Sequence, residues 1–114
     1  YRRQRQMCIR DMMELYLEKY LNSPQEKKDY KASPAVNPDL DGQPPSLIIV
    51  GGFDPLRDDA RLYAESLSDA GVDVVFHEYT GQIHAFMTLT KAIPTGLVAI
   101  GETADYMRRR FALA

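Results

Sequence analysis

The stretch SLIIVGGFDPLRDDARLYAESLSDAGVDVVFHEY, residues 46–79, decides the fold class of this chain. It begins with SLIIV at 46–50, a short apolar run rich in β-branched residues between Pro45 and Gly51. Such a run predicts a strand that is buried on both faces, as strands of parallel sheets are. The residues after Gly51 then decide how the chain returns to a second strand.

A helix is expected next, over about residues 56–70, because apolar residues recur there at helical spacing. These residues are Ala60, Tyr63, Ala64 and Leu67. Gly71 follows, where the end of a helix favours a left-handed residue. VDVVFHEY at 72–79 has the apolar pattern of a second strand. Strand, helix and strand therefore form one crossover unit, which is expected to be right-handed.

Further helices are expected on both sides of this unit. Residues 3–21 show helical spacing of Ile9, Met13, Tyr16, Leu17 and Tyr20. Residues 22–46 contain five prolines among Asp, Asn, Lys and Gly, which predicts an irregular connector. Residues 95–111 predict a last helix with an apolar stripe made of Leu97, Ile100, Ala104, Met107 and Phe111.

The fold class that follows is α/β, with two parallel strands, flanking helices and an incomplete sheet. Two strands and three helices leave a strand edge with unpaired backbone groups. Either sequence outside this chain or a partner chain is expected to complete the sheet. The opening residues YRRQRQMCIR have neither an initiator methionine nor an apolar signal core, which suggests a fragment that starts inside a helix.

Composition excludes several classes of function. The 114 residues are 45% hydrophobic and 26% charged, with a formal net charge of -2, so nothing draws the chain toward nucleic acid or an anionic membrane. No apolar run is long enough to span a bilayer. Cys8 is the single cysteine and has no partner for an internal disulfide. These features predict a soluble cytoplasmic protein without a nucleic-acid partner or a membrane span.

Asp54 and His84 are the candidate catalytic residues. Each follows a predicted parallel strand at its carboxyl end, where functional side chains of open α/β sheets gather. An acid that holds an imidazole fixes its tautomer and stabilises its protonated form, so the pair would be half of a hydrolase triad. Each residue alone also has an ordinary explanation, because Asp before Pro is a common cap or turn former and a lone His is commonly a surface residue.

PPSLIIVGGFDPLRDDARLYAESLSDAGVDVVFHEYTGQIHAF, residues 44–86, resembles the C-terminal part of the hormone-sensitive-lipase-like branch of the α/β-hydrolases, which are carboxylesterases. That family shows D-P-L-R-D-E after one strand and Y-x-G-x-x-H-G-F after the next. The likeness extends over about residues 30–111. It implies that Asp54 and His84 are the triad acid and base, acting on a small-molecule ester. It also implies that residues 1–30 are a helix and connector related to the cap over the acyl pocket, and that residues 31–114 are the C-terminal part of the hydrolase core.

The chain departs from the family in three respects. Asp59 replaces the usual Glu, and Ala85 replaces the glycine that follows the catalytic histidine. The nucleophile motif G-x-S-x-G and the H-G-G-type loop of the oxyanion hole are both missing from the sequence. None of the serines has the flanking glycines of such an elbow: Ser23, Ser33, Ser46, Ser66 and Ser68. The isolated chain is therefore expected to be inactive.

Other chemistries have less support in the sequence. Cys8 is a nucleophile in principle, but a buried small apolar residue is the preferred interpretation. His77 and His84 lack the clustered acid of a metal site, and no cofactor is expected. A flavodoxin-like or receiver-like domain needs about five strands. The remaining alternative is a non-catalytic α/β interaction fragment whose exposed strand edge drives self-association or pairing with a missing N-terminal part.

Overall fold

The computed structural model describes residues 10–112. The first part of the predicted helix, with Met7, Cys8 and Ile9, lies outside the described residues. The elements in chain order are α1 (Arg10–Tyr20), η2 (Pro24–Lys28), η3 (Pro34–Val36), β1 (Ser46–Gly51), α2 (Arg57–Asp69), β2 (Val74–Tyr79), η4 (Phe86–Thr88) and α3 (Thr95–Ala112). The predicted strand, helix and strand are confirmed with small shifts at their ends. The connector is irregular except for the single 3₁₀ turns η2 and η3.

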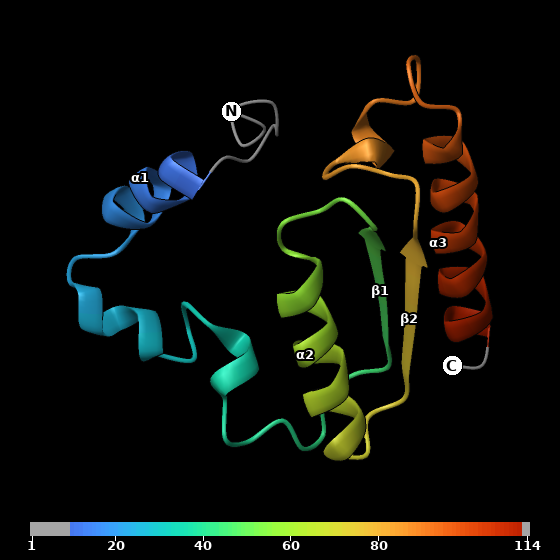
Figure 1. Cartoon of the computed structure of the whole chain (residues 1–114). Coiled ribbons are helices and arrows are strands. Elements are labelled where there is room, and N and C mark those ends of the chain that lie inside the picture. The colour runs from blue at the N-terminus through green and yellow to red at the C-terminus, as the bar shows by residue number, and fades with distance from the viewer. Residues whose placement is uncertain (1–9, 113–114) are drawn as a thin grey trace.

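β1 and β2 pair in parallel, from Ser46 opposite Val74 to Gly51 opposite Tyr79, and they are the two strands of the sheet within residues 10–112. Helices α2 and α3 cover opposite faces of this sheet (Figure 1). Alternate residues of β2 show the two faces, because Phe76 lies under Arg61 of α2 whereas Tyr79 reaches Glu102 of α3. The result is a three-layer α/β/α arrangement.

The core lies between the sheet and α2. Leu67 of α2 is 1% exposed and packs with Leu40 and Val72, while Ile48 and Val74 contribute from the two strands. Leu40 belongs to the connector, so that segment closes the core although it has little regular structure. The helix ends as its sequence predicts, because Gly71 adopts a φ of 80°.

The buried residues of helix α3 are small. Gly96 and Ala99 are buried, and a Cβ atom at Gly96 would stand 2.7 Å from the carbonyl oxygen of Phe86. The helix therefore approaches η4 as closely as a glycine allows. The predicted apolar stripe exists but lies mostly on the exposed side of the helix; its exposed members are Leu97, Ile100, Met107 and Phe111.

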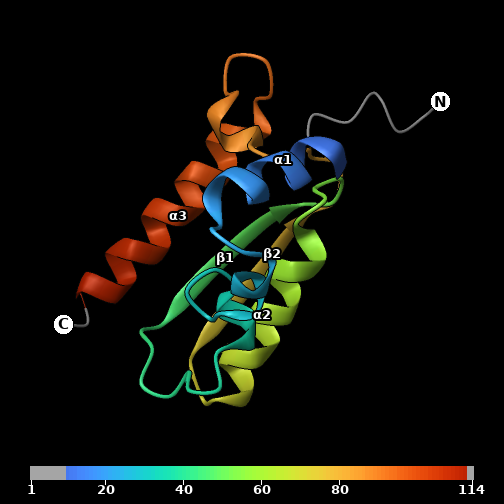
Figure 2. The same ribbon diagram turned by 90° about the vertical axis from the view of Figure 1, so that its left-hand side faces the viewer.

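The carboxyl ends of both strands meet at one end of the molecule, and helix α1 lies at the same end (Figures 1 and 2). The loop after β1 leads directly into α2, and the loop after β2 leads through η4 to α3. Of the helices in the described part of the chain, none combines the length and apolar character that crossing a membrane requires. The fold thus brings two loops, and the candidate residues on them, to one edge of the sheet.

Candidate active site

Asp54 and His84 form a direct side-chain pair. His84 Nδ1 lies 2.8 Å from Asp54 Oδ2, and the Asp54 side chain is only 10% exposed whereas that of His84 is 39% exposed. A carboxylate only accepts hydrogen bonds, so Nδ1 carries the hydrogen, and in the neutral imidazole Nε2 then has the free lone pair. The predicted juxtaposition is therefore present, and it leaves an oriented imidazole with one basic nitrogen.

The two oxygens of Asp54 have separate partners. Oδ1 accepts a hydrogen bond from the Leu56 amide at 2.8 Å, which closes the turn ahead of α2, and Oδ2 holds His84. The Asp54 amide in turn donates to the Gly51 carbonyl at 3.1 Å. One oxygen of this carboxylate thus closes the turn, and the same bond orients the other oxygen toward the histidine.

Backbone hydrogen bonds tie the two loops together. The Gly52 amide donates to the Tyr79 carbonyl at 2.9 Å, and the Phe53 amide donates to the Gln82 carbonyl at 2.9 Å. These bonds continue the β1–β2 pairing past the ends of both strands. Asp54 directly follows Phe53, so these hydrogen bonds between the loops place Asp54 beside His84 on the other loop.

Glycine makes this approach of the two loops possible. A Cβ atom at Gly52 would lie 2.2 Å from the Thr80 carbonyl oxygen, and one at Gly51 would lie 2.6 Å from the Gln82 carbonyl oxygen. Both distances are far below normal contact, and the obstacles are backbone atoms that cannot rotate away. The GG pair before Phe53 is therefore a requirement of the site rather than a flexible hinge.

Ala85 adopts a left-handed conformation with φ of 59°, the one positive φ among the non-glycine residues that the structure describes. Its carbonyl accepts hydrogen bonds from the amide and the hydroxyl of Thr88, which closes η4. This conformation turns Phe86 into the interior, where it is 3% exposed. Alanine thus occupies, with some strain, a conformation that a glycine adopts freely.

A second histidine–carboxylate contact lies on the α3 face of the sheet. His77 Nδ1 is 2.8 Å from both carboxylate oxygens of Glu102, and the Tyr79 hydroxyl donates to Glu102 Oε2 at 2.7 Å. The His77 and Tyr79 rings stack with centroids 4.3 Å apart. His77 thus faces helix α3, and these contacts join β2 to that helix.

The pKa values of this cluster are displaced in opposite directions. Burial and the adjacent Glu102 carboxylate raise the pKa of Tyr79 to about 12. Burial by itself would raise the pKa of Glu102, but hydrogen bonds from Tyr79 and His77, with the charges of His77 and Arg109, together lower it. The cluster therefore favours a neutral phenol and a charged carboxylate.

Arg57 and three of the serines make contacts with nearby backbone or side-chain groups. Arg57 donates to the Gly52 carbonyl at 3.0 Å and pairs with Asp58 at 3.0 Å. The hydroxyls of Ser33, Ser46 and Ser66 donate to backbone carbonyls. Within residues 10–112, no group of three or more His, Cys, Asp or Glu side chains is arranged to hold a metal. Asp54 and His84 are thus the pair that the structure brings together.

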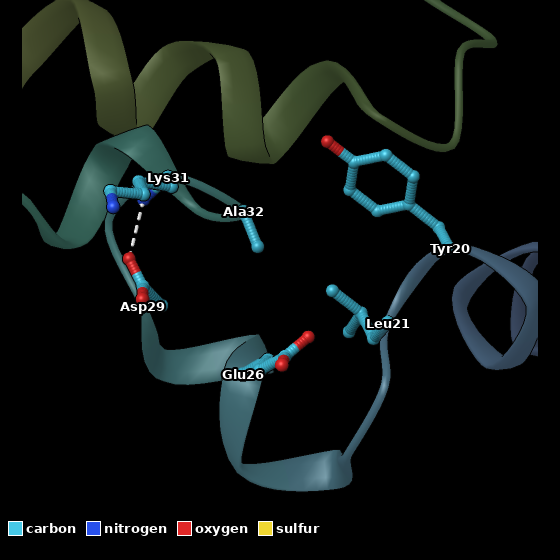
Figure 3. A pocket seen from close by; sticks show the side chains of 6 residues that line it. All are labelled: Tyr20, Leu21, Glu26, Asp29, Lys31 and Ala32. Atoms are coloured by element: carbon cyan, nitrogen blue, oxygen red, sulfur yellow. Dashed lines mark hydrogen bonds between the residues drawn. The ribbon is translucent and has the colours of Figure 1, made fainter.

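A hollow of about 350 Å³ lies beside the end of α1 (Figure 3), and neither Asp54 nor His84 lines it. Its walls come from the end of α1 and the connector: Tyr20, Leu21, Glu26, Asp29, Lys31 and Ala32. Asp29 Oδ1 accepts a hydrogen bond from the Lys31 amide at 2.9 Å, which shapes the connector locally. Side chains of α1 therefore do border a cavity, but not one that contains the candidate catalytic groups.

Sequence reasoning missed Glu102 and the structural importance of Tyr79. Glu102 falls on the sheet-facing side of α3, three residues after the buried Ala99, and an acid at such a position is a signal of a buried partner. Tyr79 stands within the quoted Y-x-G-x-x-H pattern but appears there only as a strand residue. The contact between them depends on how α3 crosses the sheet, which no periodicity reports.

Replacement of Gly52 by alanine is expected to destabilise the chain by about 1–3 kcal/mol or more, because its methyl group has to displace the Thr80 backbone. Gly81→Ala is the matched control, since a Cβ atom there meets nothing within 4 Å. The control should change stability by less than about 0.5 kcal/mol. Urea unfolding of both variants measures the difference, and equal stabilities would contradict the close approach of the two loops.

Stability is also expected to fall at high pH because of Tyr79. Its pKa rises from 10.0 to about 12 on folding, so its contribution is complete below pH 10 and is lost as the pH rises toward 12. Urea unfolding at about pH 9 and about pH 11.5 should show a larger loss for the wild type than for Tyr79→Phe. Tyr30→Phe, at an exposed tyrosine, should keep the wild-type loss. Equal losses in wild type and Tyr79→Phe would disprove the effect.

Solved structures contain the same arrangement of elements. An α/β-hydrolase enzyme from the metagenome of Lake Arreo in Spain matches 94% of this chain with a TM-score of 0.88 and 34% identity. A thermophilic carboxylesterase cloned from a metagenomic library matches 93% of the chain with a TM-score of 0.88 and 31% identity. The chain covers 34% and 36% of these two proteins.

Relatives in sequence agree with the structural matches. Carboxylesterase NlhH of Mycobacterium tuberculosis is 36% identical over 73 residues, which are 64% of this chain and 23% of the relative. An esterase of Acinetobacter venetianus is 32% identical over 90 residues, which are 79% of this chain and 29% of the relative. A family model of the α/β-hydrolase fold matches residues 1–88. The chain spans under a third of these two relatives, and it belongs to the α/β-hydrolase family, as its resemblance to the hormone-sensitive-lipase-like carboxylesterases predicted.

Proposed function

We propose that this chain supplies the acid and the base of a serine carboxylesterase, Asp54 and His84, and that the nucleophile and the oxyanion hole come from sequence outside it. One observation carries the proposal: a half-exposed imidazole held at 2.8 Å by a carboxylate that is almost fully buried. In an ordinary surface ion pair the carboxylate is exposed, whereas Asp54 is mostly buried and both of its oxygens accept hydrogen bonds. This arrangement suits a base whose ring orientation matters.

The geometry of the pair supports the following proposed chemistry. His84 Nε2 takes the proton of a serine hydroxyl as the oxygen attacks the ester carbonyl, and then gives that proton to the leaving alcohol. Asp54 holds the ring in the tautomer that leaves Nε2 basic and stabilises the imidazolium while it is charged. The substrates proposed are esters of short to medium acyl chains, in keeping with the esterase names of the relatives.

The sequence lacks the motifs for a nucleophile and an oxyanion hole, which supports an active site formed jointly with sequence outside this chain. The sequence contains no G-x-S-x-G and no H-G-G-type loop, and the matched esterases are about three times as long as the segment that matches. Loss of oxyanion donors alone commonly costs a hundredfold or more in rate. His84 would thus serve a serine supplied by sequence outside this chain.

Residues 1–30 are proposed to contribute to the cap over the acyl pocket. Helix α1 lies at the end of the molecule where the strand carboxyl ends meet (Figure 2). It carries exposed apolar side chains that lack a core to pack on within the described chain, namely Leu15, Tyr16 and Tyr20. Met and aromatic side chains at that end of the sheet suit the lining of a channel for an acyl group.

Activity tests the proposal with two proteins. The 114-residue chain alone should neither hydrolyse a p-nitrophenyl ester nor react with a fluorophosphonate probe for activated serine. In a polypeptide that joins it to an upstream G-x-S-x-G segment, Asp54→Asn and His84→Gln should each lower kcat by roughly 10⁴-fold. Asp69→Asn, at an exposed acid at the end of α2, should leave kcat within about twofold. Turnover by the isolated chain, or an active His84→Gln variant, would refute the assignment.

A second candidate function is association without catalysis, and the exposed surfaces favour it. One edge of β1 has no partner strand within the described residues, and α3 exposes Leu97, Ile100, Met107 and Phe111. Between them lies an apolar hollow of about 340 Å³, lined in part by Leu47 and Ile49. In this alternative, we propose that another chain covers this surface and pairs with the strand edge.

Light scattering during size-exclusion chromatography tests that association. The isolated chain should elute as a dimer or larger species. The unpaired edge of β1 and the exposed apolar side chains of α3 would then contact a second copy of the chain. Ile49→Lys, in the apolar hollow, should shift the chain toward the monomer. Val36→Lys, at an exposed site on the connector, is the control. A wild-type chain that stays monomeric at all concentrations would argue against edge-driven association.

A further inference from the structure

Tyr79 occupies the junction of the two loops that carry Asp54 and His84. It is the last residue of β2, and its carbonyl oxygen accepts two backbone hydrogen bonds. One comes from the Gly52 amide at 2.9 Å, on the loop of Asp54, and the other comes from the Gln82 amide at 3.0 Å, on the loop of His84. A single backbone atom therefore connects both halves of the pair.

The side chain of Tyr79 is held just as firmly on the other face of the strand. Its hydroxyl donates to Glu102 Oε2 at 2.7 Å, and its ring lies 5.2 Å from that of Phe86 at a tilt of 48°. Phe86 is buried and stands two residues after His84, on the far side of the left-handed Ala85. The phenol ring is thus wedged between helix α3 and the turn that follows the histidine.

We propose that Tyr79, anchored by Glu102, is a positioning residue for the Asp54–His84 pair, and that α3 sets the geometry of the site through it. Its meaning for catalysis rests on the proposed esterase function, whereas the positioning itself concerns only contacts within this chain. Tyr79 touches neither reacting group; it acts through the carbonyl that both loops share and through the Phe86 ring.

The physical argument is one of constraint. An unanchored strand end frays, because the last residues of a two-stranded sheet have few neighbours. The phenol hydroxyl reaches a charged acceptor, and hydrogen bonds of that kind stabilise more than neutral ones do. The anchored Tyr79 ring fixes the direction of the Tyr79 carbonyl, and Phe86 fixes the start of η4. A shift of the Tyr79 carbonyl or of η4 would lengthen the distance between His84 Nδ1 and Asp54 Oδ2.

The competing explanation is that the β1–β2 ladder alone fixes the carbonyl and that Glu102 only fastens α3 to the sheet. The chain allows a clean distinction, because it contains only two histidines and each donates Nδ1–H to a different carboxylate. Proton and nitrogen NMR of the full 114-residue chain should therefore show one hydrogen-bonded imidazole proton from His77 and one from His84.

Exchange of these two protons with water is the measurement. In Tyr79→Phe, which keeps the ring and the carbonyl, the His84 proton should exchange about tenfold faster or more, because the anchor to a charged group is lost. The His77 proton should persist, since Glu102 is intact. Glu102→Leu should speed up both protons, and Glu102→Gln, whose amide oxygen still accepts from Tyr79, should keep His84 within about threefold of wild type. Tyr30→Phe, at an exposed tyrosine, should change neither.

Unchanged exchange at His84 in both Tyr79→Phe and Glu102→Leu would overturn the proposal, as would the lack of a hydrogen-bonded His84 proton in the wild-type chain. If the circular dichroism of Glu102→Leu shows that this variant is unfolded, the exchange rate of the His84 proton in Tyr79→Phe alone tests the proposal, because that substitution removes only the hydroxyl oxygen. The readout needs no turnover. Its failure is therefore distinct from failure of the esterase assignment, which the activity of the Asp54 and His84 variants decides.

Discussion

The parallel register that sets Gly51 opposite Tyr79 is the constraint on which the site depends. Both strands end at this pair, so both loops start at the same level. The ladder then continues through Gly52 and Phe53, and it carries Asp54 to the neighbouring loop. Without side chains at the two glycines, the backbones approach closely enough for a carboxylate on one loop to hold an imidazole on the other.

The chain contains two histidine–carboxylate contacts of the same length, and their surroundings separate their roles. The His77–Glu102 contact lies on the face of the sheet, where Tyr79 shares the carboxylate and the bond joins a strand to a helix. The pair of Asp54 and His84 lies beyond the carboxyl ends of the strands, where α/β folds commonly place their reactive groups. Contacts of equal length thus have different surroundings: one joins a strand to a helix, and the other is the pair that we propose as the acid and the base.

The apolar stripe of α3 and the free edge of β1 fit one explanation. Leu97, Met107 and Phe111 recur at helical spacing as core residues do, yet they are exposed here because the sheet ends at β1 within the described chain. The residues of helix α3 that are buried instead are small, Gly96 and Ala99, and Gly96 lies against η4. A helix with apolar residues on more than one side is suited to a larger sheet or to a neighbouring helix, in agreement with the length of the related esterases.

The sequence by itself determined the order of the elements, the parallel sheet and the meeting of Asp54 and His84 beyond the carboxyl ends of the strands, because periodicity, Pro and Gly positions and strand order are local or topological properties. Only the tertiary structure decided which face of α3 meets the sheet, that Glu102 receives Tyr79, and that Gly52 leaves no room for a methyl group. Those contacts join residues far apart in the chain, and their distances depend on how a helix crosses the sheet and how two loops approach, which no local pattern specifies.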